Sequence, residues 1–284
     1  MPSTFNSQHA TPNIDPTRWY DRIWASFIYF TRLPFGRLHQ PPRECFQTVV
    51  EHWPLVGWLT GSLMALTLWG VSLYMPYPVA VLAAIAVRLL VTGALHEDGL
   101  ARFLDGFGGG TGRERILANM NDTHIGIYGV VGLILYFLLL AAALCSMTPA
   151  VAAVTILAAD PFAKMAASEL VMMMPHARSG REANDGLVCR RIDVKTGISL
   201  AVQGLLPIVA FIWLTGIAWE LLFFVPCVVM YFLYLLVWRR IGGYTGDCCG
   251  AVCLLVELTA ILVVCSQDIH LISFPPVSSL LPSQ

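Results

Sequence analysis

Residues 127–147 read IYGVVGLILYFLLLAAALCSM, and this apolar run decides the fold class of the chain. It carries no charged side chain, and its length meets the roughly 20 residues that an α-helix needs to cross a hydrocarbon core. The whole sequence shares this bias, since 57% of its 284 residues are hydrophobic and only 12% are charged. Soluble domains carry about 25% charged residues. The sequence therefore predicts an all-α, polytopic helical bundle that is integral to a membrane.

Seven apolar runs predict about seven membrane spans. They cover Trp53–Tyr74, Pro78–Leu95, Ile127–Met147, Ala150–Met174, Gly197–Thr215, Trp219–Trp238 and Ala251–Val264. We expect one transmembrane domain over residues 20–267, flanked by a polar N-terminal tail (1–19) and a C-terminal tail (268–284). The start of the chain lacks the pattern of a signal peptide, so the first span is expected to serve as its own insertion signal.

The basic residues predict the orientation in the membrane. With these seven spans, all but two of the 17 Lys and Arg residues fall on one side of the membrane, and the exceptions, Arg88 and Lys164, lie within spans. By the positive-inside rule the basic side is cytoplasmic. The N-terminus and three long loops are therefore predicted to be cytoplasmic, and the C-terminus is predicted to lie outside. The loops are His96–Gly126, Pro175–Thr196 and Arg239–Gly250.

The first loop opens with residues 96–110, HEDGLARFLDGFGGG, the richest set of chemical groups in the chain. If the second span continues as a helix into this block, Asp98, Arg102 and Asp105 share one face at positions i, i+4 and i+7. Two carboxylates on one face suit Mg²⁺, which completes its shell with phosphate oxygens and water. The glycines that follow allow the backbone to approach a phosphate closely. The alternative is a solvated connector with Asp-Gly turns.

Two further cytoplasmic segments carry groups that can complete such a site. Residues 121–126, NDTHIG, bring Asp122 to the start of the third span. Residues 239–247, RRIGGYTGD, place glycines, a threonine and Asp247 after two arginines, which suits a second phosphate or metal contact. This signal is weak alone, because two arginines at the cytoplasmic end of a span also act as a topology anchor.

Some ionisable residues lie inside the predicted spans. Asp160 and Lys164 stand at i and i+4, so they form either a mutually neutralising pair or a substrate contact, and both interpretations stay open. Glu257 lies two to three turns into the last span. Because intramembrane charges are costly and usually face the bundle interior, we expect Glu257 to serve a site rather than to face lipid.

Taken together, these segments resemble the cobalamin synthase family, the adenosylcobinamide-GDP ribazoletransferases. The resemblance covers nearly the whole chain, in order and at similar intervals. Its most specific part is the His-x-Asp-Gly-x-Ala block followed by Asp-Gly, with Thr-Gly-Asp in support. It is carried by residues 30–34 (FTRLP), 54–57 (PLVG), 96–110, 122–126 (DTHIG), 175–178 (PHAR) and 242–247 (GGYTGD), with Glu257 beyond them.

The resemblance implies a Mg²⁺-dependent transfer catalysed by domain 20–267 in the cytoplasmic (inner) membrane of a bacterium. A ribose oxygen of α-ribazole, or of its 5′-phosphate, attacks the cobinamide-side phosphorus of adenosylcobinamide-GDP, and GMP leaves. We expect His96 and Asp98 to be catalytic, with His96 as proton acceptor. The expected metal ligands are Glu97, Asp98, Asp105 and Asp122. The expected substrate or phosphate contacts are Arg102, Arg178, Asp247, Gly108 and Gly109.

The chain departs from the family pattern at two positions. Arg102 stands where an aspartate is common, so a cation that pairs with Asp98 or Asp105 replaces one carboxylate, and the number of metal ligands stays open. Asn121 stands where a basic residue is common.

Two other classes of membrane protein are weighed against this one. A CDP-alcohol phosphotransferase also uses metal-bound aspartates, but here Ala101 and Arg102 stand one position too close to Asp98 for its signature. A small-solute transporter is expected to carry ionisable residues and broken helices at mid-bilayer, whereas the acidic residues here gather in cytoplasmic loops. The net charge of −1 provides no field for nucleic acid, so the expected partners are the two substrates and membrane lipid. A homo-oligomer or a contact with other corrinoid-pathway enzymes stays open.

Overall fold

The computed structural model of the protein describes residues 18–178 and 193–267, and within these ranges the chain is helical and contains no β-strand. Most of both predicted tails, and residues 179–192 of the predicted second loop, lie outside the described residues. The short N-terminal elements are α1 (Asp21–Phe30), α2 (Phe35–Leu38) and the 3-10 helix η1 (Arg43–His52). The remaining helices are α3 (Trp53–Ser72), α4 (Tyr77–Thr92), α5 (Leu95–Gly109), α6 (Arg113–Asn121), α7 (Ile127–Cys145), α8 (Pro149–Met173), α9 (Val194–Thr215), α10 (Trp219–Ile241) and α11 (Gly246–Cys265).

Six of the described helices are long and apolar enough to cross a membrane, namely α7 to α11 and the continuous helical stretch formed by η1 and α3. The bent pair α4 and α5 provides a seventh candidate. These helices cover the seven apolar runs, because long apolar segments in a bilayer satisfy their backbone polar groups by forming helices. The prediction of a polytopic all-α bundle with about seven spans is therefore confirmed.

The second predicted span, Pro78–Leu95, is where the fold differs from expectation. Helix α4 ends at Thr92, and the axis turns by 90° before α5 begins. Gly93 and Ala94 make the turn with φ angles of 67° and 57°. Glycine adopts this left-handed region freely, whereas alanine does so at a cost of roughly 1–2 kcal/mol. Residues 96–109 are helical, but they form the separate helix α5 and do not continue the second span in a straight line, which was the condition for the shared face of Asp98, Arg102 and Asp105.

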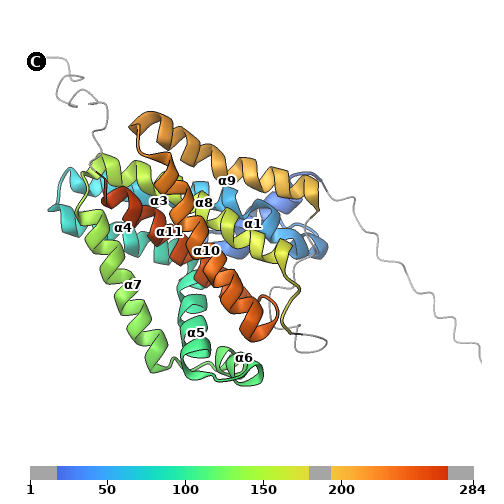
Figure 1. Ribbon diagram of the computed structural model, residues 1–284. Coiled ribbons are helices and arrows are strands. Elements are labelled where there is room, and N and C mark those ends of the chain that lie inside the picture. The colour runs from blue at the N-terminus through green and yellow to red at the C-terminus, as the bar shows by residue number, and fades with distance from the viewer. Residues whose placement is uncertain (1–17, 179–192, 268–284) are drawn as a thin grey trace, which may run out of the picture.

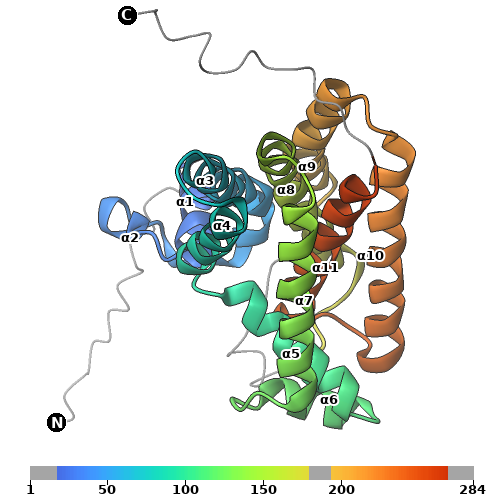
Figure 2. The ribbon, with the colours of Figure 1, turned by 90° about the vertical axis from the view of Figure 1, so that its left-hand side faces the viewer.

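Helices α8 and α11 form the centre of the bundle. The apolar windows of these two helices are 78% and 72% buried, whereas those of α7, α9 and α10 are only 22–28% buried. Helix α8 packs against α3, α9 and α11, and α11 packs against α5, α8 and α10. Figure 2 shows α3 and α4 on one side, α10 on the other, and α8 and α11 between them. The exposed apolar faces of the outer helices are suited to contact with lipid.

Ionisable side chains in the centre of the bundle neutralise one another. Lys164 forms an ion pair with Asp160 one turn away, and Thr60 donates a hydrogen bond to the same carboxylate at 2.5 Å. Glu257 faces the bundle interior, as expected, where Arg88 donates to it at 2.7 Å. These contacts match the interpretation of Asp160 and Lys164 as a mutually neutralising pair.

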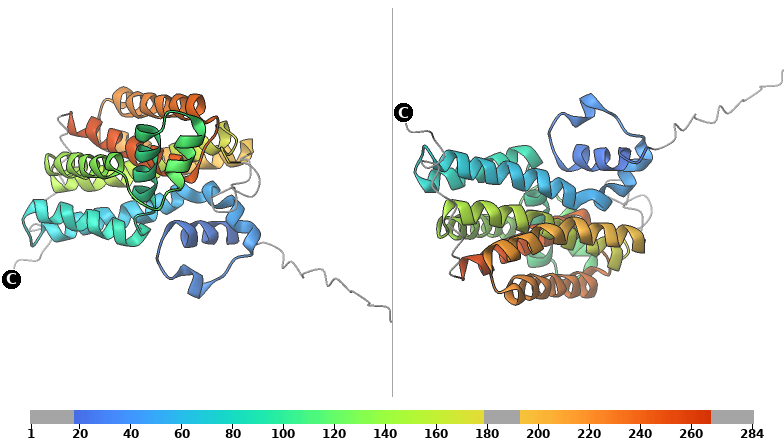
Figure 3. Two further views of the ribbon diagram at one scale, coloured as in Figure 1. Left: turned by 90° about the horizontal axis from the view of Figure 1, so that it is seen from below. Right: turned by 90° about the horizontal axis from the view of Figure 1, so that it is seen from above.

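Helix α5 runs downward from the other helices in the view of Figure 1, and α6 lies beside its lower end. Seen from below in Figure 3, this green segment passes in front of the other helices. The loop expected at Arg239–Gly250 is much shorter in the structure, because α10 continues to Ile241 and α11 already begins at Gly246. Asp247 consequently belongs to the first turn of α11, and α11 packs directly against α5.

Candidate active site

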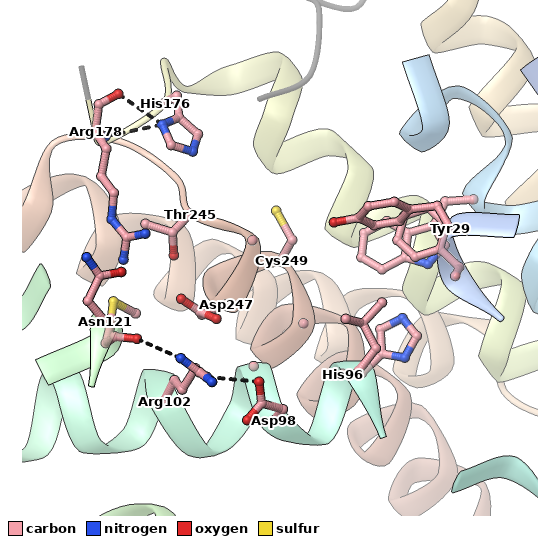
Figure 4. Close-up of a pocket in the computed structure, with 17 residues that line it drawn as sticks. Tyr29, His96, Asp98, Arg102, Asn121, His176, Arg178, Thr245, Asp247 and Cys249 are labelled. Atoms are coloured by element: carbon pink, nitrogen blue, oxygen red, sulfur yellow. Dashed lines mark hydrogen bonds and ion pairs between the residues drawn. The ribbon is translucent and has the colours of Figure 1, made fainter. Parts of the chain in front are cut away.

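A cavity of about 290 Å³ opens where α5, the first turn of α11 and the segment after α8 meet. Five of the residues predicted for the site line this one cavity (Figure 4). They are His96, Asp98, Arg102, Arg178 and Asp247. Segments far apart in the sequence thus contribute two carboxylates, two guanidinium groups and an imidazole to a single space.

Two glycines allow α5 and α11 to approach each other closely enough to share the cavity. A Cβ atom on Gly99 would lie 3.3 Å from the Cα of Asp247, and one on Gly250 would lie 3.2 Å from the carbonyl oxygen of His96. Small residues at a helix–helix contact let the two backbones come together. The contact brings Asp98 on α5 and Asp247 on α11 to the same space.

Arg102 is paired with Asp98, which matches one of the two partners expected for this cation. Its Nε donates to the Asp98 carboxylate at 2.8 Å, one helical turn away. Its Nη1 reaches the backbone carbonyl of Asp122 at 3.4 Å. The Asp98 side chain is still 60% exposed, so its remaining lone pairs can bind a ligand.

Arg178 is held at the cavity by a backbone bridge between two loops. Tyr244 donates from its N–H to the carbonyl of Pro175 at 3.0 Å, and Ala177 donates to the carbonyl of Tyr244 at 2.8 Å. The Nε and Nη2 atoms of Arg178 are buried and have no hydrogen-bond partner among the described residues. An unsatisfied buried cation is costly, and a guanidinium binds phosphate through paired hydrogen bonds. Arg178 is therefore suited to an anionic ligand that enters the cavity.

Arg113 and Arg240, which were not among the predicted site residues, hold the loops around the site. Arg113 donates to the carbonyl oxygens of Ile241 at 2.9 Å and of Ala177 at 2.5 Å. Arg240 donates to the carbonyl of Gly110 at 2.9 Å. These bonds join the start of α6, the end of α10 and the segment that carries Arg178, so both arginines act as positioning residues.

Asp105 lies outside the cavity and caps α7. Its two carboxylate oxygens accept hydrogen bonds from the backbone N–H groups of Gly126 at 2.7 Å and Gly129 at 2.8 Å. A Cβ atom at either glycine would lie 2.5 Å from an Asp105 oxygen, so this cap requires glycine at both positions. A carboxylate at a helix N-terminus satisfies donors that the helix itself leaves free.

Glu97 and Asp122, two more of the predicted metal ligands, also do not line the cavity. Glu97 is buried beside Arg88, with 3.8 Å between its Oε1 and the guanidinium. Asp122 accepts a hydrogen bond from the His124 amide at 2.9 Å, and this bond, with that of the His124 ring, holds the pKa of Asp122 below its ordinary value. No cluster of three or more His, Cys, Asp or Glu suited to a metal exists among residues 18–178 and 193–267. The structure does not bring the four expected metal ligands together.

The two glycines predicted to contact phosphate also lie away from the cavity. They belong to the last turn of α5. A Cβ atom on Gly108 would lie 2.6 Å from the ring of Tyr128, and one on Gly109 would lie 3.2 Å from the side chain of Asn119. These glycines pack α5 against its neighbours in the chain.

The two carboxylates in the cavity are too few to enclose a magnesium ion by themselves. Asp98 and Asp247 both line the space. Mg²⁺ is commonly held by one or two carboxylates together with substrate phosphates and water, rather than by a cage made entirely of protein ligands. The donor set therefore fits an ion that is shared with a bound diphosphate.

The opposite end of the cavity is aromatic, and sequence reasoning missed most of it. Phe30 and Trp53 stack with centroids 4.6 Å apart and an interplanar angle of 6°. Trp53 and His96 stack at 5.6 Å and 14°. Tyr29 adds a further ring beside them. Apolar rings in apolar segments carry no motif, so the only signal was the place of Phe30 in the family-like block 30–34.

Comparisons with known proteins agree with the resemblance. The family described as cobalamin-5-phosphate synthase matches residues 22–265. An adenosylcobinamide-GDP ribazoletransferase of Ralstonia nicotianae is 34% identical over 248 residues, which is 85% of this chain and 93% of that protein. Proteins of the same name from Shewanella sp. (strain W3-18-1) and Shewanella frigidimarina are each 31% identical, over 86% and 87% of this chain and 93% and 96% of their own lengths. No solved structure was found to match the chain.

The structure is a bundle of helices suited to a membrane, with a charged cavity. The family match covers nearly the whole length of the same chain. The chain belongs to the cobalamin-5-phosphate synthase family, and the resemblance seen in its motifs is confirmed.

Proposed function

We propose that this protein transfers the cobinamide-phosphate group of adenosylcobinamide-GDP to α-ribazole or its 5′-phosphate, and releases GMP. The product is adenosylcobalamin or its 5′-phosphate. Family membership supports the reaction, since the curated relatives are named adenosylcobinamide-GDP ribazoletransferases. The observation that carries it to this cavity is Arg178, which lines it with Asp98, Arg102 and Asp247 and has two buried guanidinium nitrogens without a hydrogen-bond partner among the described residues.

The cations of the cavity bind the diphosphate. Arg178 and Arg102 contact its oxygens, and the start of α11 contributes backbone N–H groups and the positive end of a helix dipole. As the bond from phosphorus to GMP breaks, negative charge grows on the leaving GMP phosphate. Fixed cations that face this charge lower the barrier, because they need no rearrangement during the reaction.

The attacking hydroxyl of the ribose forms a new bond to phosphorus and gives up its proton. His96 lines the cavity, and its buried Nε2 has no hydrogen-bond partner among the described residues. His96 accepts the proton, and Asp98 orients the hydroxyl beside it. Asp98 and Asp247 would hold the Mg²⁺ that the family resemblance implies, and that ion would supply charge neutralisation at the diphosphate.

The reaction is tested by the release of GMP from adenosylcobinamide-GDP by the purified protein, with and without α-ribazole and Mg²⁺. Release that requires all three components supports the proposal. Release of GMP without α-ribazole would indicate a hydrolase. No release at any Mg²⁺ concentration, from protein that remains folded, would refute the proposed transfer.

The cavity faces the cytoplasm of a bacterial inner membrane in this proposal, with the N-terminus inside and the C-terminus outside. The arginines around the cavity support this side, by the positive-inside rule. Asn121→Cys in α6 and Tyr74→Cys after α3 replace exposed residues at opposite ends of the bundle. With the native cysteines replaced by serine, a membrane-impermeant thiol reagent applied to intact cells is expected to label only the variant at position 74. Labelling of position 121 alone would reverse the orientation.

A further inference from the structure

The cavity is divided into a charged end and an aromatic end. Figure 4 shows Arg102 and Arg178 at one end, Tyr29 and His96 at the other, and Asp98 with Asp247 between them. The charged end matches a diphosphate, which leaves the aromatic end without a role in binding phosphate.

The rings at this end form a nearly parallel stack. The planes of Phe30 and Trp53 differ by 6°, those of Trp53 and His96 by 14°, and those of Phe30 and His96 by 11°. Tyr29 meets the edge of Phe30 at 4.9 Å and is 39% exposed. Phe30, Trp53 and His96 are buried against one another, so Tyr29 is the ring of this group that is exposed enough to stack on a flat base, a contact worth roughly 1–3 kcal/mol.

Two polar atoms of the stack are buried without a partner. Trp53 Nε1 and His96 Nε2 accept or donate no hydrogen bond among the described residues, and each side chain belongs to a residue that is only 2% exposed. Leaving a buried donor unsatisfied costs about 1–3 kcal/mol. Because both residues line the cavity, a ligand can satisfy these atoms. The aromatic end therefore fits a flat, mostly apolar ligand with few polar atoms.

Guanine and benzimidazole, the two bases in the proposed reaction, differ in the number of polar atoms that they carry. Guanine carries donors and acceptors along its whole edge, and an aromatic-lined space would leave several of them unpaired. The benzimidazole base of α-ribazole is apolar except for one free ring nitrogen, which accepts a hydrogen bond and has no N–H. An indole N–H only donates, so Trp53 Nε1 complements that nitrogen.

We propose that Tyr29, Phe30, Trp53 and His96 form the binding site for the benzimidazole base of α-ribazole and thereby select the lower base of the product. This assignment rests on the proposed transferase function. With the base in the cavity that these side chains line, the attached ribose lies beside His96 and Asp98, and its hydroxyl faces the diphosphate held by Arg178. The base, the ribose hydroxyl and the diphosphate then follow one another along the cavity, which is the order that the attack of the hydroxyl on phosphorus requires.

The test is the binding of α-ribazole to the detergent-purified full chain, measured by calorimetry, together with the KM values for both substrates. Tyr29→Leu removes the exposed ring and is expected to weaken α-ribazole binding by at least about fivefold, while the KM for adenosylcobinamide-GDP stays within about twofold. The matched control is Tyr74→Leu, which removes a tyrosine that is 85% exposed after α3 and outside the cavity. It is expected to change neither value.

A second variant tests the hydrogen bond separately from the stacking. Trp53→Phe keeps an aromatic ring and removes the N–H donor, so it is expected to weaken α-ribazole binding by about fivefold. The probe for comparison is an indole riboside, in which a C–H group replaces the free ring nitrogen. This analogue is expected to bind the wild-type protein and the Trp53→Phe variant equally.

Each contrary outcome has a separate meaning. A Tyr29→Leu variant that raises the KM for adenosylcobinamide-GDP, and leaves α-ribazole binding unchanged, would assign the rings to guanine and overturn the proposal. Unchanged binding of both substrates in a folded variant would make the rings purely structural and also overturn it. If the wild-type protein binds α-ribazole through these rings but releases no GMP, the proposed transfer fails while the base site stands.

Discussion

Replacing Arg88 by methionine is expected to destabilise the bundle strongly, because this arginine is the counterion of two buried carboxylates. Its Nη1 lies 2.7 Å from Glu257 Oε1, and its Nη2 lies 3.8 Å from Glu97 Oε1. Tyr136 Oη is 3.3 Å from the same guanidinium. The charged side chains of this cluster are between 1% and 5% exposed, so water cannot replace the lost cation.

The magnitude follows from these distances. At an effective dielectric constant near 20, the gross attraction is about 6 kcal/mol for the contact with Glu257 and about 4 kcal/mol for that with Glu97. Desolvation offsets much of it, and removing one partner of a buried pair costs about 3–5 kcal/mol net. Each kcal/mol of lost stability lowers the Tm by about 2–4 °C in chains somewhat shorter than this one. The Tm of Arg88→Met is therefore expected to fall by roughly 6–20 °C.

The assay is thermal unfolding of the purified protein in detergent, applied to Arg88→Met, Glu257→Met and the double variant. Replacing both members of a buried pair by apolar residues is often neutral. The double variant leaves only Glu97 without its cation, whereas Arg88→Met leaves two carboxylates unpaired, so the double variant is expected to melt above Arg88→Met. Arg22→Met is the matched control, because its pair with Glu51 at 3.1 Å involves an arginine side chain that is 47% exposed, and it should cost less than about 1 kcal/mol. A double variant no more stable than Arg88→Met would refute the coupling between Arg88 and Glu257.

Three further predictions concern the cavity and its surroundings. Arg178→Met is expected to lower kcat by about 10²–10³-fold, with partial recovery in Arg178→Lys, and steady-state GMP release measures both; an unchanged kcat would remove Arg178 from the site. Gly250→Ala places a Cβ 3.2 Å from the His96 carbonyl and should lower kcat by at least about tenfold, whereas Gly70→Ala, with nothing within 4 Å of its Cβ, should not. Asp105→Ala should cost about 0.5–2 kcal/mol in thermal stability through loss of the α7 cap, and an Asp105→Asn variant that stays folded but loses all activity would favour a metal ligand instead.

The spans could be predicted from sequence because the bilayer demands long apolar runs, and the residues between Trp53 and Val264 provide them. The right-angled bend after α4 could not, because Ala94 at a positive φ has no signature in composition or periodicity. Five polar residues of the cavity were identified since they stand in polar segments between the apolar runs. Asp105 was assigned to the metal because the amides that it caps lie more than twenty residues further along the chain. The aromatic end was missed because Tyr29 and Trp53 look like ordinary membrane-interface residues.

The central claim is that α5, α11 and the segment after α8 together form one site for phosphoryl transfer. Its most direct test is the formation of adenosylcobalamin from adenosylcobinamide-GDP and α-ribazole, measured for the wild-type protein and Asp98→Asn in parallel. This substitution removes a charge at the 60% exposed cavity carboxylate and keeps its shape. The account predicts product and stoichiometric GMP from the wild-type protein, and loss of both in the variant at an unchanged Tm. Full activity of Asp98→Asn would contradict it and move the chemistry to another part of the molecule.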